Sequence, residues 1–239
     1  LNWGCIPTKA LLRSAEVFHQ MQHAKDYGLA AENITADLAA IVKRSRGVAD
    51  KLNQGVTHLM KKNKIAVHAG TGKLAAPGKL VVTGEDGKDT TLEAKHIIVA
   101  TGARARELPF KGAKADGKRI WTYRHAMTPP EMPSKLLVVG SGAIGIEFAS
   151  FYNDLGAEVT VVEMVDRIVP AEDADVSAFL EKALKKQGMT ILTGASVDKV
   201  ENGDTAVKVT IKDKAGTASE HEFSHVIVAI GILPNVENV

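Results

Sequence analysis

The sequence predicts an α/β protein of three-layer type in which two related halves follow one another along the chain. The first observation is an all-apolar run at residues 136–139, typical of a buried parallel strand, which leads through a glycine-rich turn into a helix. The second is an internal repeat, because the sequence HIIVATG at residues 96–102 resembles HVIVAIG at residues 225–231. Each copy follows strands and turns and, before them, a helix that ends in paired lysines.

The composition is ordinary for a globular chain and argues against several classes of protein. Hydrophobic residues make up 45% and charged residues 24% of the 239 residues. A net charge of +2 gives no electrostatic reason to expect nucleic acid or an anionic membrane as a partner. No apolar run approaches the roughly 20 residues that span a bilayer. One cysteine excludes an internal disulfide framework and fits a reducing compartment, and no metal site is expected.

The first half begins with helices and continues with strands. Apolar residues at helical spacing predict helix over much of residues 9–62, interrupted at Gly28 and Asn33. Strand-like segments separated by turn signals follow at residues 65–67, 79–82 and 96–100.

The second half alternates strands and helices, as expected for a parallel sheet. We expect strands at residues 136–139 and 159–163, helices at residues 143–155 and 175–187, and a region of three strands at the end of the chain. The two helices stop at Gly156 and Gly188.

The loop-rich stretch at residues 103–134 is the natural boundary between the halves. We expect one domain at residues 1–119 and a second at residues 120–239. The second copy of the repeat opens with a glycine-rich turn at Gly140, whereas the first copy has none within the chain. We therefore expect the opening strand and turn of the first domain to lie upstream of Leu1, which makes that domain incomplete.

The glycine-rich turn has the sequence Gly140-Ser141-Gly142-Ala143-Ile144-Gly145, the pattern G-x-G-x-x-G. Placed between an apolar strand and a helix, and followed by a strand that ends in Glu163, it indicates a dinucleotide-binding unit of Rossmann type. Gly140 permits the tight turn, Gly142 lets the backbone approach a pyrophosphate, and Gly145 lets helix and strand pack closely. The helix N-terminus at Ala143 and Ile144 would hold that pyrophosphate.

Two carboxylates extend this predicted site. Glu163 would accept hydrogen bonds from the adenosine ribose and would repel a 2′-phosphate, so NAD is favoured over NADP. Arg167 lies four residues further on and could soften that preference. Glu147, in the first turns of the helix, is either a second carboxylate near the cofactor or a plain surface acid. The alternative for the whole turn is a glycine-rich connection without a ligand.

The cysteine, Cys5, follows Gly4 and precedes an apolar-periodic helix. The positive end of a helix dipole favours a thiolate, and Lys9 one turn further on would add to this effect. The alternative is a small, buried and inert hydrophobic residue.

The first nine residues, LNWGCIPTK, also resemble part of the redox motif of the pyridine nucleotide-disulfide oxidoreductases. That motif is C-x-x-x-x-C, usually followed by I-P-[ST]-K, and Cys5 matches its second cysteine. The resemblance implies that the first cysteine immediately precedes Leu1. It covers essentially the whole chain and implies two Rossmann-like domains that bind FAD and NAD(P), the first of them incomplete.

Within this family the chain is most similar to enzymes that oxidise dihydrolipoamide to lipoamide with NAD⁺ through FAD and a redox-active disulfide. The similarity rests on GCIPTKALL at residues 4–12, GSGAIGIE at residues 140–147 and the acid Glu163. At the cysteine, glutathione reductases have a motif similar to GCVPKK, and mercuric reductases have one similar to GCVPSK. Both classes therefore match this chain less well, but they stay as alternatives. Two further hypotheses stay open. In one, the chain binds NAD without redox turnover; in the other, Cys5 is a single peroxidatic cysteine that is oxidised to a sulfenic acid.

The resemblance implies a role for each matching residue. Cys5 would be the sulfur next to the flavin, and Lys9 would lie near the flavin N5 and pair with Glu147. Residues lining the cofactors at the ends of the two domains would be Thr101, Gly102 and Gly231. The chain departs from the family pattern at Trp3, where most members have Val, and at Ile232, where many have Arg.

The resemblance also implies partners and a location. The substrate would be dihydrolipoamide on a lipoyl-bearing subunit of a 2-oxo acid dehydrogenase complex. The full-length protein would be a homodimer, with its interface domain and His-Glu dyad beyond Val239. It would work in a bacterial cytoplasm or a mitochondrial matrix. His221 and His225 flank a strand and are expected to be structural.

Overall fold

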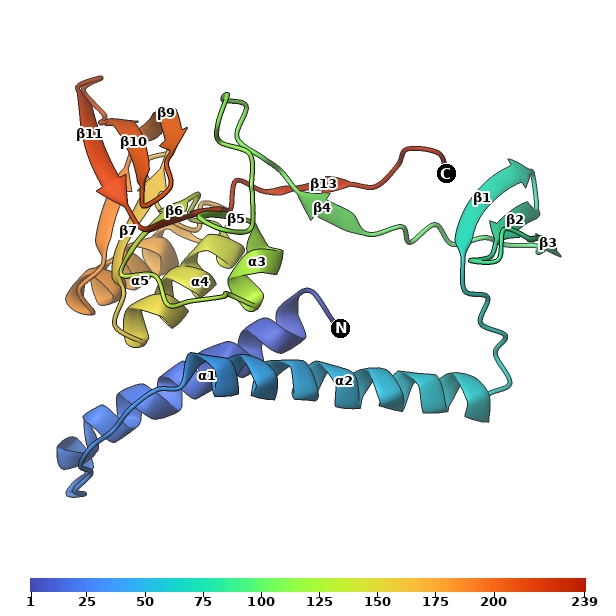
Figure 1. The fold of residues 1–239 in the computed structure, drawn as a ribbon, viewed down its shortest axis with the longest axis horizontal. Helices are drawn as coiled ribbons and strands as arrows, with labels where there is room; N and C mark the ends of the chain where they lie inside the picture. Colours follow the sequence, from blue (N-terminus) through green and yellow to red (C-terminus); the bar gives the residue numbers. More distant parts are fainter. The chain divides into compact units, whose positions relative to one another are not determined.

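The computed structural model describes residues 1–239 and divides them into two compact units (Figure 1). The first unit comprises Leu1–Lys51 and Ala105–Gly231, and the second comprises Leu52–Arg104 and Ile232–Val239. This division differs from the expected boundary between residues 119 and 120, because the N-terminal helices pack with the C-terminal half. The assignment of cofactor-binding domains to residues 1–119 and 120–239 stays a prediction.

A five-stranded parallel sheet forms the centre of the first unit. Its strands are β5 (Ile120–Trp121), β6 (Lys135–Val139), β7 (Glu158–Glu163), β8 (Thr190–Thr193) and β12 (His225–Val228). They lie in the order β5-β12-β6-β7-β8, and every neighbouring pair is parallel. Strands of such a sheet are covered on both faces, which explains why β6 is apolar almost throughout.

Successive residues of β6 face opposite layers of the unit. Leu136 and Val138 join the core on the helical side, and Leu137 and Val139 join the core on the other side. The helical layer contains α3 (Tyr123–Met127), α4 (Ala143–Asp154) and α5 (Ala174–Lys186). The opposite layer is the antiparallel sheet of β9 (Ser196–Asn202), β10 (Val207–Lys212) and β11 (Ala218–Phe223). Figure 1 shows these two layers on either side of the parallel strands. The predicted three-layer α/β fold is confirmed.

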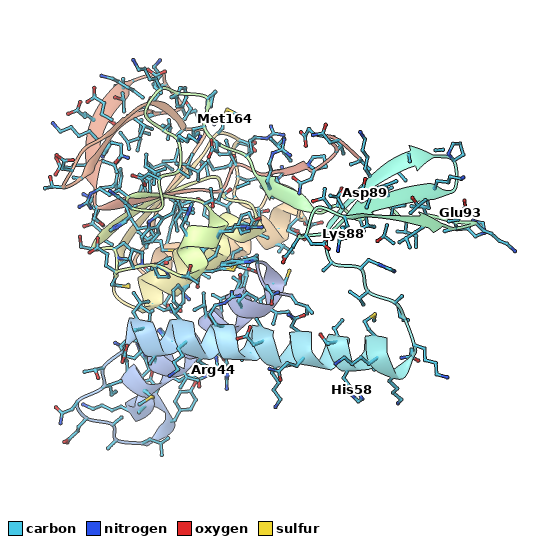
Figure 2. All side chains as sticks on the ribbon, turned by 45° about the vertical axis from the view of Figure 1, so that its right-hand side comes forward. Arg44, His58, Lys88, Asp89, Glu93 and Met164 are labelled. Carbon is cyan, nitrogen blue, oxygen red and sulfur yellow. The ribbon has the colours of Figure 1, made fainter.

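Helix α1 (Cys5–Gln22) and the part of helix α2 (Leu38–Lys62) up to Lys51 belong to the first unit, on this helical side. Helix α1 packs against α4 through Leu11 and Ala15, which are fully buried. Helix α2 begins after the short helix η1 (Ala24–Tyr27) and the breaks predicted at Gly28 and Asn33. Arg44 on α2, labelled in Figure 2, donates from Nη1 to the carbonyl oxygen of Ala10 on α1 at 2.7 Å.

The second unit contains two small antiparallel sheets. One is formed by β1 (Thr71–Ala76), β2 (Lys79–Thr83) and β3 (Asp89–Glu93), and the other by β4 (Ala103–Ala105) with β13 (Ile232–Pro234). The strand predicted at residues 79–82 is confirmed as β2. Thr83 on β2 donates from Oγ1 to Asp89 on β3 at 2.7 Å, and Figure 2 labels Asp89 on this sheet.

The strands predicted at residues 65–67 and 96–100 are wrong. Both segments are irregular and exposed, with Ile98 at 91% exposure. A strand is defined by hydrogen bonds to a neighbouring strand, and no strand among residues 1–239 pairs with either segment. These two segments therefore have the apolar pattern of a strand but no neighbouring strand to pair with.

The internal repeat extends to the backbone hydrogen bonds of the hairpins. In the loop between β2 and β3, the N–H of Gly84 donates to the carbonyl group four residues later at 2.9 Å. In the loop between β10 and β11, the N–H of Asp213 makes the same bond at 3.0 Å. The two loops precede the repeated segments at His96 and His225 by the same spacing. The β1–β3 and β9–β11 sheets are thus equivalent parts of two copies.

Candidate functional site

The turn between β6 and α4 is so tight that two of its glycines have no room for a side chain. Gly140 has φ +97°, in the left-handed region that favours glycine. A Cβ atom on Gly140 would lie 2.5 Å from the carbonyl oxygen of Ala229. A Cβ atom on Gly145 would overlap the carbonyl oxygen of Gly140. The first and third glycines of the pattern therefore let α4 start directly against the end of the strand.

The second glycine, Gly142, borders open space. It is the N-cap of α4, without a side-chain cap hydrogen bond, and a Cβ atom there would meet nothing within 4 Å. The N–H groups of Ala143 and Ile144 in the first turn of a helix have no intrahelical acceptor. They lie at the positive end of the helix dipole. The turn thus offers room and donors for an anionic group such as a pyrophosphate.

Glu163, at the end of β7, accepts hydrogen bonds through both carboxylate oxygens. Oε2 accepts from the backbone N–H of Ser141 at 2.8 Å and from its hydroxyl group at 2.6 Å. Oε1 accepts from the N–H of Val165 at 3.0 Å. Burial alone would raise the pKa of Glu163, but these hydrogen bonds hold the pKa below its ordinary value. Glu163 is therefore an ionised acceptor beside the turn, and Figure 2 labels the exposed Met164 that follows it.

Ser141 is a functional candidate that the sequence interpretation missed. It occupies a variable position of G-x-G-x-x-G, yet its side chain is fully buried against Glu163. Its carbonyl oxygen accepts from the N–H of Val169 at 3.0 Å. Val169 has φ +38°, which is unusual for a β-branched residue. A hydroxyl residue between the first two glycines, combined with the acid at the end of the second strand, was the available signal.

An ion pair joins the cysteine helix to the helix that follows the turn. Lys9 on α1 donates from Nζ to Oε1 of Glu147 on α4. Glu147 therefore has a partner from another helix and is not a free surface acid. Cys5 is the first residue of α1 and is exposed, so the alternative of a buried cysteine is wrong. The structure brings Lys9 and Glu147 into contact and places Cys5 one turn before Lys9 on α1.

Trp3 fixes the segment that precedes Cys5. Two guanidinium groups lie over its ring, with Cζ of Arg46 at 4.5 Å and Cζ of Arg124 at 5.4 Å from the ring centroid. Arg46 also donates to the carbonyl oxygen of Asn2 at 2.7 Å. The side chain that departs from the family pattern thus holds this segment against α2 and α3.

The remaining predicted site residues lie outside the G-x-G-x-x-G turn in the sequence. Thr101 and Gly102 are in the second unit, where both contact Asn235. Thr101 donates from Oγ1 to the carbonyl oxygen of Asn235, whose own N–H donates to the carbonyl oxygen of Gly102 at 3.0 Å. Gly231 belongs to the first unit and accepts from the N–H of Arg106 at 3.0 Å.

The histidines offer no metal centre, since no three His, Cys, Asp or Glu side chains gather in a group that could hold an ion. His225 is buried against the ring of Trp121, with ring centroids 4.4 Å apart. Burial lowers the pKa of His225, and the Glu131 carboxylate, 3.3 Å from Nε2, acts in the opposite direction. We also find no helix with the length and apolar character needed to cross a membrane.

Comparison with known proteins decides the family. Residues 1–239 match the family model described as pyridine nucleotide-disulphide oxidoreductase. The chain belongs to this family. It is 54% identical over 239 residues to a dihydrolipoyl dehydrogenase of Zymomonas mobilis, covering 100% of this chain and 51% of that protein. It is 48% identical to the dihydrolipoyl dehydrogenase of Rhizobium etli, covering 100% of this chain and 52% of that protein.

Solved structures agree with the fold. The chain resembles LpdA from Mycobacterium tuberculosis with a TM-score of 0.87 and 31% identity, covering 99% of this chain and 50% of that one. The flavoprotein disulfide reductase RclA from Escherichia coli, 24% identical with a TM-score of 0.80, has the same fold over 99% of this chain and 48% of its own. The chain therefore spans about half the length of the relatives it matches.

In this member of the family, the first unit carries most of the predicted site. The fingerprint turn at residues 140–145, Glu163, and the Lys9–Glu147 pair all lie on it. Their elements are neighbours, since α1 packs on α4 and β6 pairs with β7. The cysteine helix and the dinucleotide fingerprint are thus parts of one compact unit.

Proposed function

We propose that the chain is the redox and dinucleotide-binding part of a dihydrolipoyl dehydrogenase, which oxidises dihydrolipoamide to lipoamide with NAD⁺. The observation that carries this proposal is the ion pair between Lys9 and Glu147, because it joins the helix of the Cys5 motif to the helix of the fingerprint turn. The names and identities of the relatives from Zymomonas mobilis and Rhizobium etli support the choice within the family.

In the proposed reaction, Cys5 forms a disulfide with a cysteine that precedes Leu1. One thiolate of dihydrolipoamide attacks this disulfide, and its second thiol then displaces the protein sulfur. The products are the lipoamide disulfide and two protein thiols. When bound, FAD would supply the two-electron chemistry by which the two protein thiols return to the disulfide while NAD⁺ takes up a hydride and one proton is released. The exposed position of Cys5 at the start of α1 suits a sulfur that must reach another group.

We propose that NAD binds at the fingerprint turn. The first-turn N–H groups of Ala143 and Ile144 would hold the pyrophosphate above Gly142, where space is open. Gly140 and Gly145 would keep the turn closed, and Glu163 would accept a ribose hydroxyl group. Gly231 would line the same cofactor.

We propose that Cys5, Lys9, Thr101 and Gly102 face FAD, which the family resemblance supports. The chain holds one G-x-G-x-x-G turn, at residues 140–145, and this turn is assigned to NAD. The phosphates of FAD would therefore bind residues outside these 239. Next to the redox sulfur, the positive charge of Lys9 and the negative charge of Glu147 would neutralise each other.

Partners and location follow from the same proposal. The substrate would be dihydrolipoamide on the lipoyl-bearing subunit of a 2-oxo acid dehydrogenase complex, and the full-length protein would be a homodimer. Its location would be a bacterial cytoplasm or a mitochondrial matrix, and the relatives named above are bacterial.

The test is the formation of NADH by the full-length protein that contains this chain, with dihydrolipoamide as the electron donor. We expect NADH to form with the native sequence and turnover to disappear in Cys5→Ser. Ser219→Ala, a change at β11 far in sequence from the motif, should leave turnover unchanged. No turnover with dihydrolipoamide, together with NADPH-dependent reduction of glutathione disulfide or mercuric ion, would instead support one of the alternative reductases.

A further inference from the structure

The carboxylate of Glu163 has little acceptor capacity left for a ligand. A carboxylate offers about four lone-pair sites, two on each oxygen. Both sites of Oε2 are used by Ser141, through its N–H at 2.8 Å and its hydroxyl group at 2.6 Å. Oε1 already accepts from the N–H of Val165 at 3.0 Å. At most one direction on Oε1 is therefore open to a ribose hydroxyl group.

Ser141 is itself held in place, so it can act as a fixed support. Its side chain is fully buried, and a buried hydroxyl group beside a carboxylate donates its one proton to that carboxylate. Its carbonyl oxygen accepts from the N–H of Val169 at 3.0 Å. Val169 adopts φ +38°, a conformation that costs energy for a β-branched residue and persists where the surroundings impose it. Ser141 is thus held by its own backbone in the position from which it donates to Glu163.

We propose that Ser141 is a positioning residue that sets the preference for NAD(H) over NADP(H) by preventing the Glu163 carboxylate from turning away. The proposal rests on the assignment of NAD to the fingerprint turn. A 2′-phosphate would meet a negative charge that cannot rotate, and repulsion between like charges is strongest when neither group can move apart. The N–H of Ser141 is also unavailable to any phosphate, because Glu163 occupies it.

The experiment is calorimetric titration of the chain with NADH and with NADPH. In Ser141→Ala the hydroxyl bond is lost but the N–H bond to Glu163 stays. We expect the ratio of the dissociation constant for NADPH to that for NADH to fall about tenfold. This is the size expected for one hydrogen bond to a charged group. Ser45→Ala is the matched control, since Ser45 is equally buried but bonds to the carbonyl oxygen of Val42 on α2. It should leave the ratio unchanged.

Two further readouts separate positioning from a general loss of structure. In a Glu163→Gln background, Ser141→Ala should cause no additional change in the ratio, because Ser141 acts through the carboxylate. Loss of the hydroxyl bond also raises the pKa of Glu163. As the pH is lowered, Glu163 should therefore be protonated, and the preference for NADH lost, at a higher pH in Ser141→Ala than in the native chain.

The proposal is overturned if Ser141→Ala keeps the native ratio, or if it lowers the ratio equally in the Glu163→Gln background. Native chain that binds neither dinucleotide would refute the NAD site itself and this inference with it. Native chain that prefers NADH, with an unchanged Ser141→Ala variant, would refute the role of Ser141 alone.

Discussion

Asp116 shows how one side chain can organise a loop beside the sheet. Its Oδ1 accepts from the N–H groups of Lys118, Arg119 and Ile120 at 2.9, 3.0 and 3.0 Å. Its Oδ2 accepts from Nδ2 of Asn202 on β9 at 2.9 Å. Burial alone would raise the pKa of Asp116, but these hydrogen bonds outweigh it and lower the pKa from 3.8 to about 2.

Asp116 should therefore make the stability of the protein depend on pH under acidic conditions. A lowered pKa in the folded state contributes stability that is fully present above 3.8 and is lost as the pH falls through about 2. Because Asp116 is exposed, solvent screening limits this contribution to about 1 kcal/mol. We expect Asp116→Asn to lower the free energy of unfolding by that amount at neutral pH and by less near pH 2, measured by urea denaturation.

Asp86 supplies the matched control for this measurement. It accepts from the N–H of Lys88 at 3.1 Å within its own turn but has no partner from a distant strand. Asp86→Asn should change the free energy of unfolding little at any pH. Equal losses in Asp86→Asn and Asp116→Asn would contradict the assigned role of Asp116.

Tyr152 gives a second prediction for a single side chain. Its hydroxyl group is buried and donates to the carbonyl oxygen of Ala126 at 2.8 Å, and burial raises its pKa well above the ordinary value. Tyr152→Phe leaves that carbonyl group without a partner and should lower the free energy of unfolding by about 1–2 kcal/mol. Tyr27→Phe, at a side chain that is 70% exposed, should have almost no effect in the same thermal denaturation assay.

Among the secondary-structure elements, those with local signals were predicted best. Strands β6 and β7 and helices α4 and α5 lie within about one residue of the expected positions, because glycines end these helices and apolar patterns mark the strands. The segments at residues 65–67 and 96–100 failed because strand formation depends on a partner that local sequence does not contain.

The room available for a Cβ atom distinguishes two glycines that both lie in helices. A Cβ atom on Gly145 would overlap the carbonyl oxygen of Gly140, whereas a Cβ atom on Gly55 in α2 would meet nothing within 4 Å. We expect Gly145→Ala to lower the free energy of unfolding by about 2–3 kcal/mol through the forced shift of the turn. Gly55→Ala should raise it by about 0.5–1 kcal/mol through helix propensity.

Chemical denaturation of both variants checks this pair, and NADH titration adds a functional measurement. Gly145→Ala should weaken NADH binding, because the turn and the start of α4 must move, and Gly55→Ala should leave it unchanged. A stable Gly145→Ala variant with native NADH affinity would contradict the assignment of this turn.

For the whole molecule, sequence patterns predicted the fold class, and the resemblance to the family implied the pairing of Lys9 with Glu147, which the structure places in contact. They did not predict the role of Ser141, because its position in the G-x-G-x-x-G pattern is variable and its burial depends on packing against Glu163. Nor did they predict the two compact units, since the packing of α1 on α4 joins segments more than a hundred residues apart.

The account depends most on Cys5 being half of a redox disulfide that the substrate reduces. The direct measurement is mass spectrometric mapping of Cys5 in the air-oxidised full-length protein after alkylation without a reductant. We predict that Cys5 is not alkylated and is linked to a second cysteine, and that dihydrolipoamide makes it available for alkylation. Alkylation of Cys5 as a free thiol in the oxidised protein would contradict the account.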